Sequence, residues 1–257
     1  MVIGDGNAEK GASVTIATGE AAHHDDQALM TLRAATLFTC DARGRMLLNN
    51  EPSERARQPA PRCYIGCSAR GYLLRVGATV PDDLAQELAA LVRAEPPTAD
   101  LRVSPALDAG VRTLLARHAP VGEVEGGPAY RFPERFAVPG SAVRVTSANR
   151  DLLRDTLAWL YDEVDEWQPC FGVVADGVVV SLCLSSRVSA GAAEAGVGTL
   201  PDYRGRGYAV AATAAWAAAV RSEGRIPFYS TTWENLASRA VARRLGCILI
   251  GADASWE

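Results

Sequence analysis

Apolar residues in the second half of the chain alternate between short extended runs and longer stripes with helical spacing. Strands are predicted over residues 143–146, 170–175, 178–186, 192–200, 226–232 and 247–250. Asp176-Gly177 joins two of these runs and is a strong hairpin-turn signal. Helices are predicted over residues 149–164, 205–223 and 236–245, where leucine or alanine keeps one face apolar. This order of elements predicts a domain of the α/β (α+β) class over residues 138–257.

The first half of the chain has its own pattern of strands and helices. Strand pairs are predicted over residues 36–40 with 45–48 and 63–68 with 72–76. Helices are predicted over residues 81–94 and from Ser104-Pro105 onward, followed by an extended segment over 121–132. Residues 1–27 show little periodicity and are interpreted as a mobile leader. We expect a smaller α+β domain at 28–137, acting as a substrate-side wall, a dimer surface or a decayed copy of the second domain.

Composition is that of an ordinary globular protein. Of the 257 residues, 48% are hydrophobic and 22% are charged. No apolar run reaches the roughly 18 residues of a membrane span and no N-terminal signal is present, so we expect a cytoplasmic protein without a membrane partner. The formal net charge of −4 argues against a nucleic-acid surface.

Neither cysteine nor histidine predicts a metal site. The six cysteines include no C-x-x-C pair and are interpreted as buried reduced thiols. His23 and His24 stand beside Asp25 and Asp26, but no further ligand is near in sequence, so we interpret this stretch as a solvated segment. We expect no metal cofactor.

The turn from Arg204 to Ala209 is the strongest candidate for binding chemistry. It follows a predicted strand closed by Pro201 and opens an alanine-rich helix. The first N–H groups of a helix lack helical partners and carry partial positive charge, so they attract anions. Gly205 and Gly207 let the backbone approach a phosphate, and two arginines add charge. The alternative is an ordinary glycine turn with two solvated arginines.

The sequence around this turn resembles the GCN5-related N-acetyltransferase (GNAT) superfamily. Arg204, Gly207 and Ala209 occupy the fixed positions of the family's R/Q-x-x-G-x-G/A pyrophosphate turn. Asn235, 31 positions after Arg204, and the later Leu245-Gly246 match further family positions. The resemblance covers the second domain only. It implies a mixed, mostly antiparallel sheet flanked by helices, with acetyl-CoA (coenzyme A) as co-substrate.

The resemblance also implies which residues hold acetyl-CoA. In the family, the pantetheine arm lies between two parted strands and bonds to the backbone of the earlier one, and the pyrophosphate lies on the helix N-terminus. Asn235 would bond the arm, with a helix N-cap as the alternative, and Ser238 would reach the cofactor or face solvent. The residues expected to bind acetyl-CoA are Val197, Gly198, Thr199, Arg204, Gly205, Arg206, Gly207, Tyr208, Ala209, Asn235 and Ser238.

Glu194 is the expected catalytic base. It is the only carboxylate on the strand that enters the expected site, and many relatives place their base on this strand. It lies ten positions before Arg204, whereas some relatives use eleven, and one residue reverses the direction of a side chain unless a bulge restores it. A solvent-facing strand end is the alternative, and water or backbone carbonyls serve as the base in some relatives.

Protonation of the departing thiolate is the step at which the chain departs from the family. Relatives commonly carry a tyrosine seven positions after the motif asparagine, and this chain has Ala242 there. Tyr203, Tyr208 and Tyr229 are close in sequence, but none occupies that position. Either another group or water donates the proton, or acetyl transfer is slow or lost.

The leading hypothesis is an acetyl-CoA-dependent N-acetyltransferase that transfers the acetyl group to a primary amine by direct attack in a ternary complex. The acceptor would be a small-molecule or peptide amine, and a homodimer is one option for assembly. The second hypothesis is a catalytically weak or inactive acyl-CoA-binding or regulatory module, motivated by Ala242. A dinucleotide-binding module is disfavoured because the turn lacks G-x-G-x-x-G spacing. Acidic residues 162–166 beside Trp167 either suit a cationic acceptor or form a solvated face.

Overall fold

A computed structural model describes residues 14–15, 25–97 and 99–257 of the chain. The expected leader, residues 1–27, therefore lies mostly outside the described residues. Strand β1 (Val14–Thr15) pairs with β7 (Ala137–Val138), and helix α1 (Asp26–Leu37) begins where the leader was expected to end.

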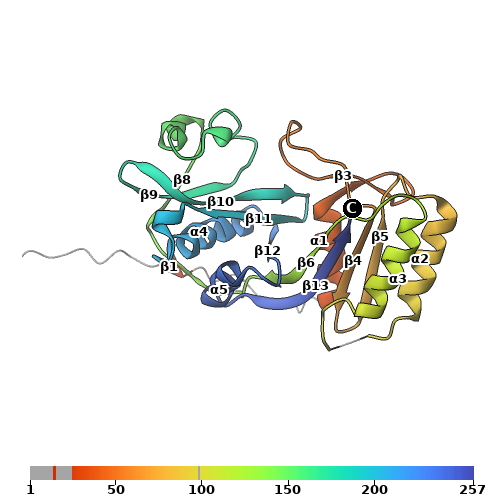
Figure 1. The fold of residues 1–257 in the computed structure, drawn as a ribbon. Coiled ribbons are helices and arrows are strands. Elements are labelled where there is room, and N and C mark those ends of the chain that lie inside the picture. Colours follow the sequence, from red (N-terminus) through yellow and green to blue (C-terminus); the bar gives the residue numbers. More distant parts are fainter. Residues whose placement is uncertain (1–13, 16–24, 98) are drawn as a thin grey trace, which may run out of the picture.

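Nine strands of the described chain form one continuous sheet in the order β5-β4-β13-β6-β12-β11-β10-β9-β8 (Figure 1). These strands are β4 (Cys63–Ser68), β5 (Gly71–Val76), β6 (Val124–Arg131), β8 (Ala142–Arg144), β9 (Cys170–Ala175), β10 (Val178–Val188), β11 (Ala192–Thr199), β12 (Ile226–Ser230) and β13 (Ile248–Trp256). Neighbours pair antiparallel except β11 with β12, which pair parallel. A separate hairpin joins β2 (Phe38–Cys40) and β3 (Met46–Asn49). The mixed, mostly antiparallel α+β fold is thereby confirmed.

This sheet runs across the domain boundary expected at residue 138. Strand β6 precedes that boundary, yet it lies between β12 and β13 of the second half, with Tyr130 opposite both Tyr229 and Leu249. Strand β13 in turn pairs with β4 of the first half. Each half of the chain thus contributes strands to one shared layer, and the division into two domains stays a prediction.

Helices cover both faces of the sheet. On one face, Met30 of α1 is buried in a cluster with Phe228 of β12. On the other face, α4 (Tyr208–Ser222) packs against Tyr229, because successive residues of a strand point to opposite faces. Helix α5 (Leu236–Arg244) lies beside α4, and α2 (Asp82–Ala94) and α3 (Pro105–Ala116) lie toward the other end of the sheet (Figure 1). No described helix has the length and apolarity needed to cross a membrane.

Helix α1 is absent from the sequence prediction, which starts a strand at residue 36. The strand begins only at Phe38, after the helix ends. Met30 and Ala34 are buried at helical spacing, but Arg33 on the same face is only 3% exposed and interrupts the apolar pattern. Because this buried charged residue interrupts the apolar stripe, helical periodicity does not predict the helix. Its N-cap was the available signal, since the Asp25 carboxylate accepts a hydrogen bond from the N–H of Gln27 at 3.0 Å.

The helix predicted over residues 149–164 is wrong. That segment contains two short 3-10 turns, Ser147–Leu153 and Ala158–Leu160. Thr146 and Asn149 form a capping box that starts the first turn, but Asn149 itself has φ −131° and ψ 20°, which breaks the helical path. The apolar side chains that prompted the prediction still reach a buried cluster.

Replacing Met30 by alanine tests whether α1 is an integral part of this fold. Met30 is fully buried against Gly66 and Gly251. Met30→Ala should therefore leave a cavity and lower the free energy of unfolding by about 2–5 kcal/mol. Leu236→Ala is the control, because Leu236 is 69% exposed, and it should change that free energy by about 0.5 kcal/mol at most. Urea denaturation measures both variants, and equal effects would show that α1 does not pack on this sheet.

Candidate functional site

Strands β11 and β12 pair only near their beginnings. Their parallel register covers three residue pairs and ends with Glu194 opposite Phe228. Beyond this point β11 continues beside β10 and β12 continues beside β6. The two strands therefore part, and beyond Glu194 the edge of β11 that faces β12 has no partner among the described strands.

The open edge of β11 presents the peptide groups of Val197 and Thr199. The N–H of Leu200 donates to the carbonyl of Val180 on β10 at 2.9 Å. Bonding alternates along an antiparallel pair, so Gly198 turns its peptide groups toward β10 and its two neighbours turn theirs away. The resemblance implies the same two residues for contact with the pantetheine arm.

A cleft of about 630 Å³ opens where the strands part. It is bounded by β11, the first turn of α4, Tyr229 of β12 and the first turns of α5. Ten of the expected acetyl-CoA-binding residues line this cleft: Val197, Gly198, Thr199, Arg204, Gly205, Gly207, Tyr208, Ala209, Asn235 and Ser238. Three separate segments of the sequence therefore converge on one opening, as the resemblance implies.

The N-terminus of α4 is open toward this cleft. Gly207 is the N-cap residue with φ 83°, and no side chain caps the helix there. Gly205 also has a positive φ, 77°, a region that favours glycine. A Cβ atom built on either glycine meets no atom within 4 Å, so there is room for a ligand above both. Helix N–H groups without internal partners, together with this space, fit a pyrophosphate.

The two arginines of the turn are arranged differently. Arg204 lines the cleft, and its Nε donates to the carbonyl of Thr199 at 3.4 Å. Arg206 is not among the lining residues. Its Nη2 donates to the carbonyl of Asp202 at 3.0 Å, and its guanidinium lies 5.1 Å from the centre of the Tyr203 ring. Arg206 is thus the expected acetyl-CoA-binding residue that the structure does not bring into the cleft.

Asn235 caps α5 and also lines the cleft. Its Oδ1 accepts a hydrogen bond from the N–H of Ser238 at 3.0 Å, and its Nδ2 bonds to no described residue. The Oγ of Ser238 lies 2.7 Å from the hydroxyl of Tyr229. The N-cap alternative for Asn235 is therefore confirmed, while a role in binding the pantetheine arm stays a prediction.

Tyr229 is a candidate that the sequence analysis set aside. It lines the cleft from β12, whereas Ala242 is buried in the core against α4. Burial raises the pKa of Tyr229 to about 12, so its hydroxyl keeps its proton at neutral pH. The sequence spacing between Tyr229 and Asn235 does not predict that Tyr229 lines the cleft, because the cleft exists only where β11 and β12 separate.

Glu194 lies on the opposite face of the sheet from the cleft. Its carboxylate is buried and accepts hydrogen bonds from Arg33 Nε at 3.0 Å and from Ser230 Oγ at 2.6 Å. The bulge lies in β10 and not in β11, so it does not redirect this side chain. The solvent-facing alternative for Glu194 is wrong, and its role as the base stays a prediction.

Arg33 joins Glu194 to two further groups. Its Nη1 donates to Asp253 Oδ2 and to the hydroxyl of Tyr64, the latter at 3.3 Å. Burial lowers the pKa of Arg33, but the carboxylates of Asp253 and Glu194 raise it by more, so its pKa lies well above the ordinary value. The guanidinium is therefore a fixed positive charge between two carboxylates. Arg33, Tyr64 and Asp253 were not predicted, because no local pattern connects them.

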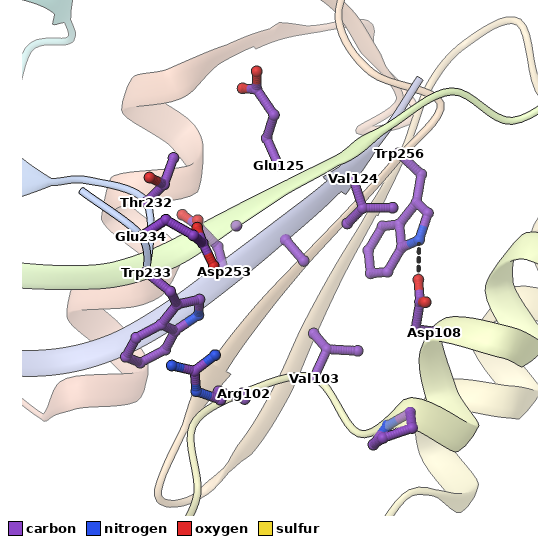
Figure 2. A pocket seen from close by; sticks show the side chains of 13 residues that line it. Arg102, Val103, Asp108, Val124, Glu125, Thr232, Trp233, Glu234, Asp253 and Trp256 are labelled. Carbon is purple, nitrogen blue, oxygen red and sulfur yellow. Dashed lines mark hydrogen bonds between the residues drawn. The ribbon is translucent and has the colours of Figure 1, made fainter. Parts of the chain in front are cut away.

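Two further clefts lie near this network. One, of about 310 Å³, is on the α1 face and is lined in part by Arg33, Tyr64, Ser230 and Asp253. The other, of about 490 Å³, lies between the start of α3 and the loop that leads to α5, and Figure 2 shows it with Trp233 and Arg102 on one side. The acidic residues 162–166 line none of these three clefts. No group of three metal-ligating side chains occurs in the described part of the chain.

One family model and several solved structures are similar to this chain. Residues 168–251 match the family model for the GNAT acetyltransferases. The chain is similar to a putative GNAT-family acetyltransferase from Novosphingobium aromaticivorans, with 22% identity, 53% of this chain and 65% of that chain covered, and a TM-score of 0.44. It is also similar to a GCN5-related N-acetyltransferase-like protein from Streptococcus suis (18% identity, 90% and 99% covered, TM-score 0.46). A GCN5-related N-acetyltransferase from Kribbella flavida is likewise similar (18% identity, 92% and 96% covered, TM-score 0.46).

No curated protein matches the chain. The family match lies in the C-terminal half, where the sequence motifs predicted the resemblance.

Replacing Tyr229 by phenylalanine tests the burial of its hydroxyl. The pKa of about 12 in the folded protein exceeds the value of about 10 for an unfolded tyrosine. Between these values the folded state binds the proton more tightly, so the free energy of unfolding falls as the pH rises. Tyr229→Phe should lose less of this free energy than the parent protein between about pH 9 and pH 11. Urea denaturation at both pH values measures the losses, and equal losses would contradict the raised pKa.

Proposed function

We propose that this protein is an acetyl-CoA-dependent N-acetyltransferase that acts on a primary amine by direct attack within a ternary complex. The observation that supports this most is the 630 Å³ cleft, because one opening combines an uncapped helix N-terminus with an unpaired strand edge. The helix N-terminus suits a pyrophosphate, and the strand edge suits the amide groups of a pantetheine arm. The family match of residues 168–251 supports the same chemistry.

In the proposed reaction, the amine nitrogen attacks the carbonyl carbon of the thioester. The C–S bond breaks, and the sulfur leaves as a thiolate. A backbone N–H of β11 stabilises the oxyanion, a contribution worth about 3–4 kcal/mol per donor in enzymes where it has been tested. The amine loses a proton and the thiolate gains one, so the products are an amide and a free thiol.

Tyr229 is the proposed donor of the proton that the thiolate gains. Tyr229 lines the cleft, its hydroxyl stays protonated at neutral pH, and the neighbouring Ser238 Oγ is positioned to orient that hydroxyl. Glu194 is proposed to act on the amine side through Ser230 and Arg33. Both of its oxygens accept hydrogen bonds from these residues, which favours a positioning role over direct removal of a proton.

Replacing Gly207 by alanine tests the pyrophosphate position. Gly207 (φ 83°) and Gly224 (φ 77°) lie at opposite ends of α4. Alanine in this left-handed region costs about 1–2 kcal/mol, so both variants should lose similar stability. Only Gly207→Ala adds a Cβ inside the cleft, and it should weaken acetyl-CoA binding about tenfold, a loss of about 1.4 kcal/mol. Isothermal titration calorimetry measures this affinity. Equal affinity for Gly207→Ala, the matched control Gly224→Ala and the parent would argue against the cleft.

Replacing Tyr229 by phenylalanine also tests the proposed proton donor. A general acid contributes about 10²–10⁴-fold to a rate, so Tyr229→Phe should slow thiol release from acetyl-CoA at least about 100-fold with unchanged acetyl-CoA affinity. Tyr203→Phe is the matched control, because Tyr203 lines the same cleft but its hydroxyl donates to Asp176 at 2.6 Å. An equal rate for Tyr229→Phe and the parent would remove Tyr229 from this role. Tight binding by the parent without turnover on any amine would favour the acyl-CoA-binding module.

A further inference from the structure

The cleft on the α1 face and the 630 Å³ cleft lie on opposite faces of strand β12. Tyr229 and Ser230 are successive residues of β12, so they point to opposite faces, and each lines a different cleft. Ser230 donates to Glu194, the last residue of β11 that pairs with β12 before the strands part. The 310 Å³ cleft therefore meets β12 at Ser230, one hydrogen bond away from Glu194, on the face opposite α4.

The two arginines that line this second cleft are already paired with buried carboxylates. Arg33 bonds to Glu194 at 3.0 Å, and Arg187 bonds to Glu51 at 2.6 Å. Three further acidic residues line the cleft: Glu125, Asp253 and Glu257. Among the described lining residues, no arginine remains to meet an anionic ligand, and the excess of carboxylates favours a cation.

Asp253 has one carboxylate oxygen available for such a ligand. Its hydrogen bonds from Arg33 and from Tyr64, the latter at 3.2 Å, both end on Oδ2. The Asp253 side chain is 16% exposed, whereas that of Glu194 is 5% exposed and has both oxygens engaged. Asp253 Oδ1 is therefore the carboxylate oxygen of this network that accepts no hydrogen bond from a described residue, whereas both oxygens of Glu194 do.

The 490 Å³ cleft shares Glu125 and Asp253 with this second cleft, and the two clefts differ in the Trp233 ring. Its half-buried Trp233 ring already faces two guanidinium groups, with Arg102 at 4.2 Å and Arg239 at 5.8 Å from the ring centre. Figure 2 shows Glu125 on the opposite side of β6 from Arg102, although both residues line this cleft. The face of the Trp233 ring is therefore already in contact with cations and is not available to a cationic ligand.

We propose that the acceptor is a cationic amine without a nearby carboxylate, and that Asp253 Oδ1 receives its ammonium group. This inference rests on the proposed transferase function. An N–H bond of the ammonium breaks and an O–H bond forms on Asp253, the neutral amine attacks the thioester, and Asp253 then releases the proton to water. Arg33 is a positioning residue that orients Asp253, and it comes from the first half of the chain.

A series of three amines of equal chain length tests the charge preference on the parent protein. 1,4-Diaminobutane, 4-aminobutan-1-ol and 4-aminobutanoate carry a positive, a neutral and a negative far end. We expect kcat/KM, measured by thiol release at saturating acetyl-CoA, to fall in that order by about tenfold per step. A preference for 4-aminobutanoate would overturn the inference and leave the proposed function standing. No thiol release with any of the three amines would overturn both.

Asp253→Asn tests the residue itself, because it removes the charge and keeps an oxygen for Arg33. We expect kcat/KM for 1,4-diaminobutane to fall about 10–100-fold, while the acetyl-CoA affinity measured by calorimetry stays the same. Asp155→Asn is the matched control, because Asp155 is exposed and lines neither cleft. An unchanged kcat/KM in folded Asp253→Asn would overturn the assignment. If this variant does not fold, the amine series on the parent still decides the question.

Discussion

The short parallel pairing of β11 with β12 is the constraint on which both clefts depend. Beyond Glu194 and Phe228, β11 keeps its antiparallel bonds to β10 and β12 keeps its bonds to β6, so each strand remains held on one edge. The peptide groups on the two facing edges have no partner among the described strands, so they can bond to a ligand or to water. The same separation opens the 630 Å³ cleft at α4 on one face and adjoins the 310 Å³ cleft at Asp253 on the other.

Both halves of the chain maintain this separation. Strand β6 occupies the far edge of β12, and α1 places Arg33 between Glu194 and Asp253. Removing one partner of a buried ion pair costs about 3–5 kcal/mol, because it leaves a charge without compensation. The network around Arg33 is therefore structural as well as a candidate for function. The first half of the chain thus supplies a central strand and a buried charge to the part of the chain that the family model matches.

Local signals in the sequence predicted most elements of the second half. The Asp176-Gly177 hairpin, the alanine-rich α4 and the glycine turn before it depend on residues that are neighbours in sequence, so pattern and turn chemistry suffice. The features that the sequence did not predict depend on contacts that sequence patterns do not show. Helix α1 was overlooked because Arg33 is buried by an ion pair to Asp253, 220 positions away. Tyr229 enters the cleft only because β11 and β12 part, and Arg206 turns away because it bonds within its own turn.

Backbone hydrogen exchange with and without acetyl-CoA measures the parted-strand cleft itself. We expect saturating acetyl-CoA to slow exchange of the amides of Val197 and Thr199 and of residues 205–210, since these peptide groups would gain partners. The amides around Gly224, at the far end of α4, should exchange at the same rate in both conditions and serve as the internal control. Unchanged exchange in both segments would contradict binding of acetyl-CoA between β11 and β12.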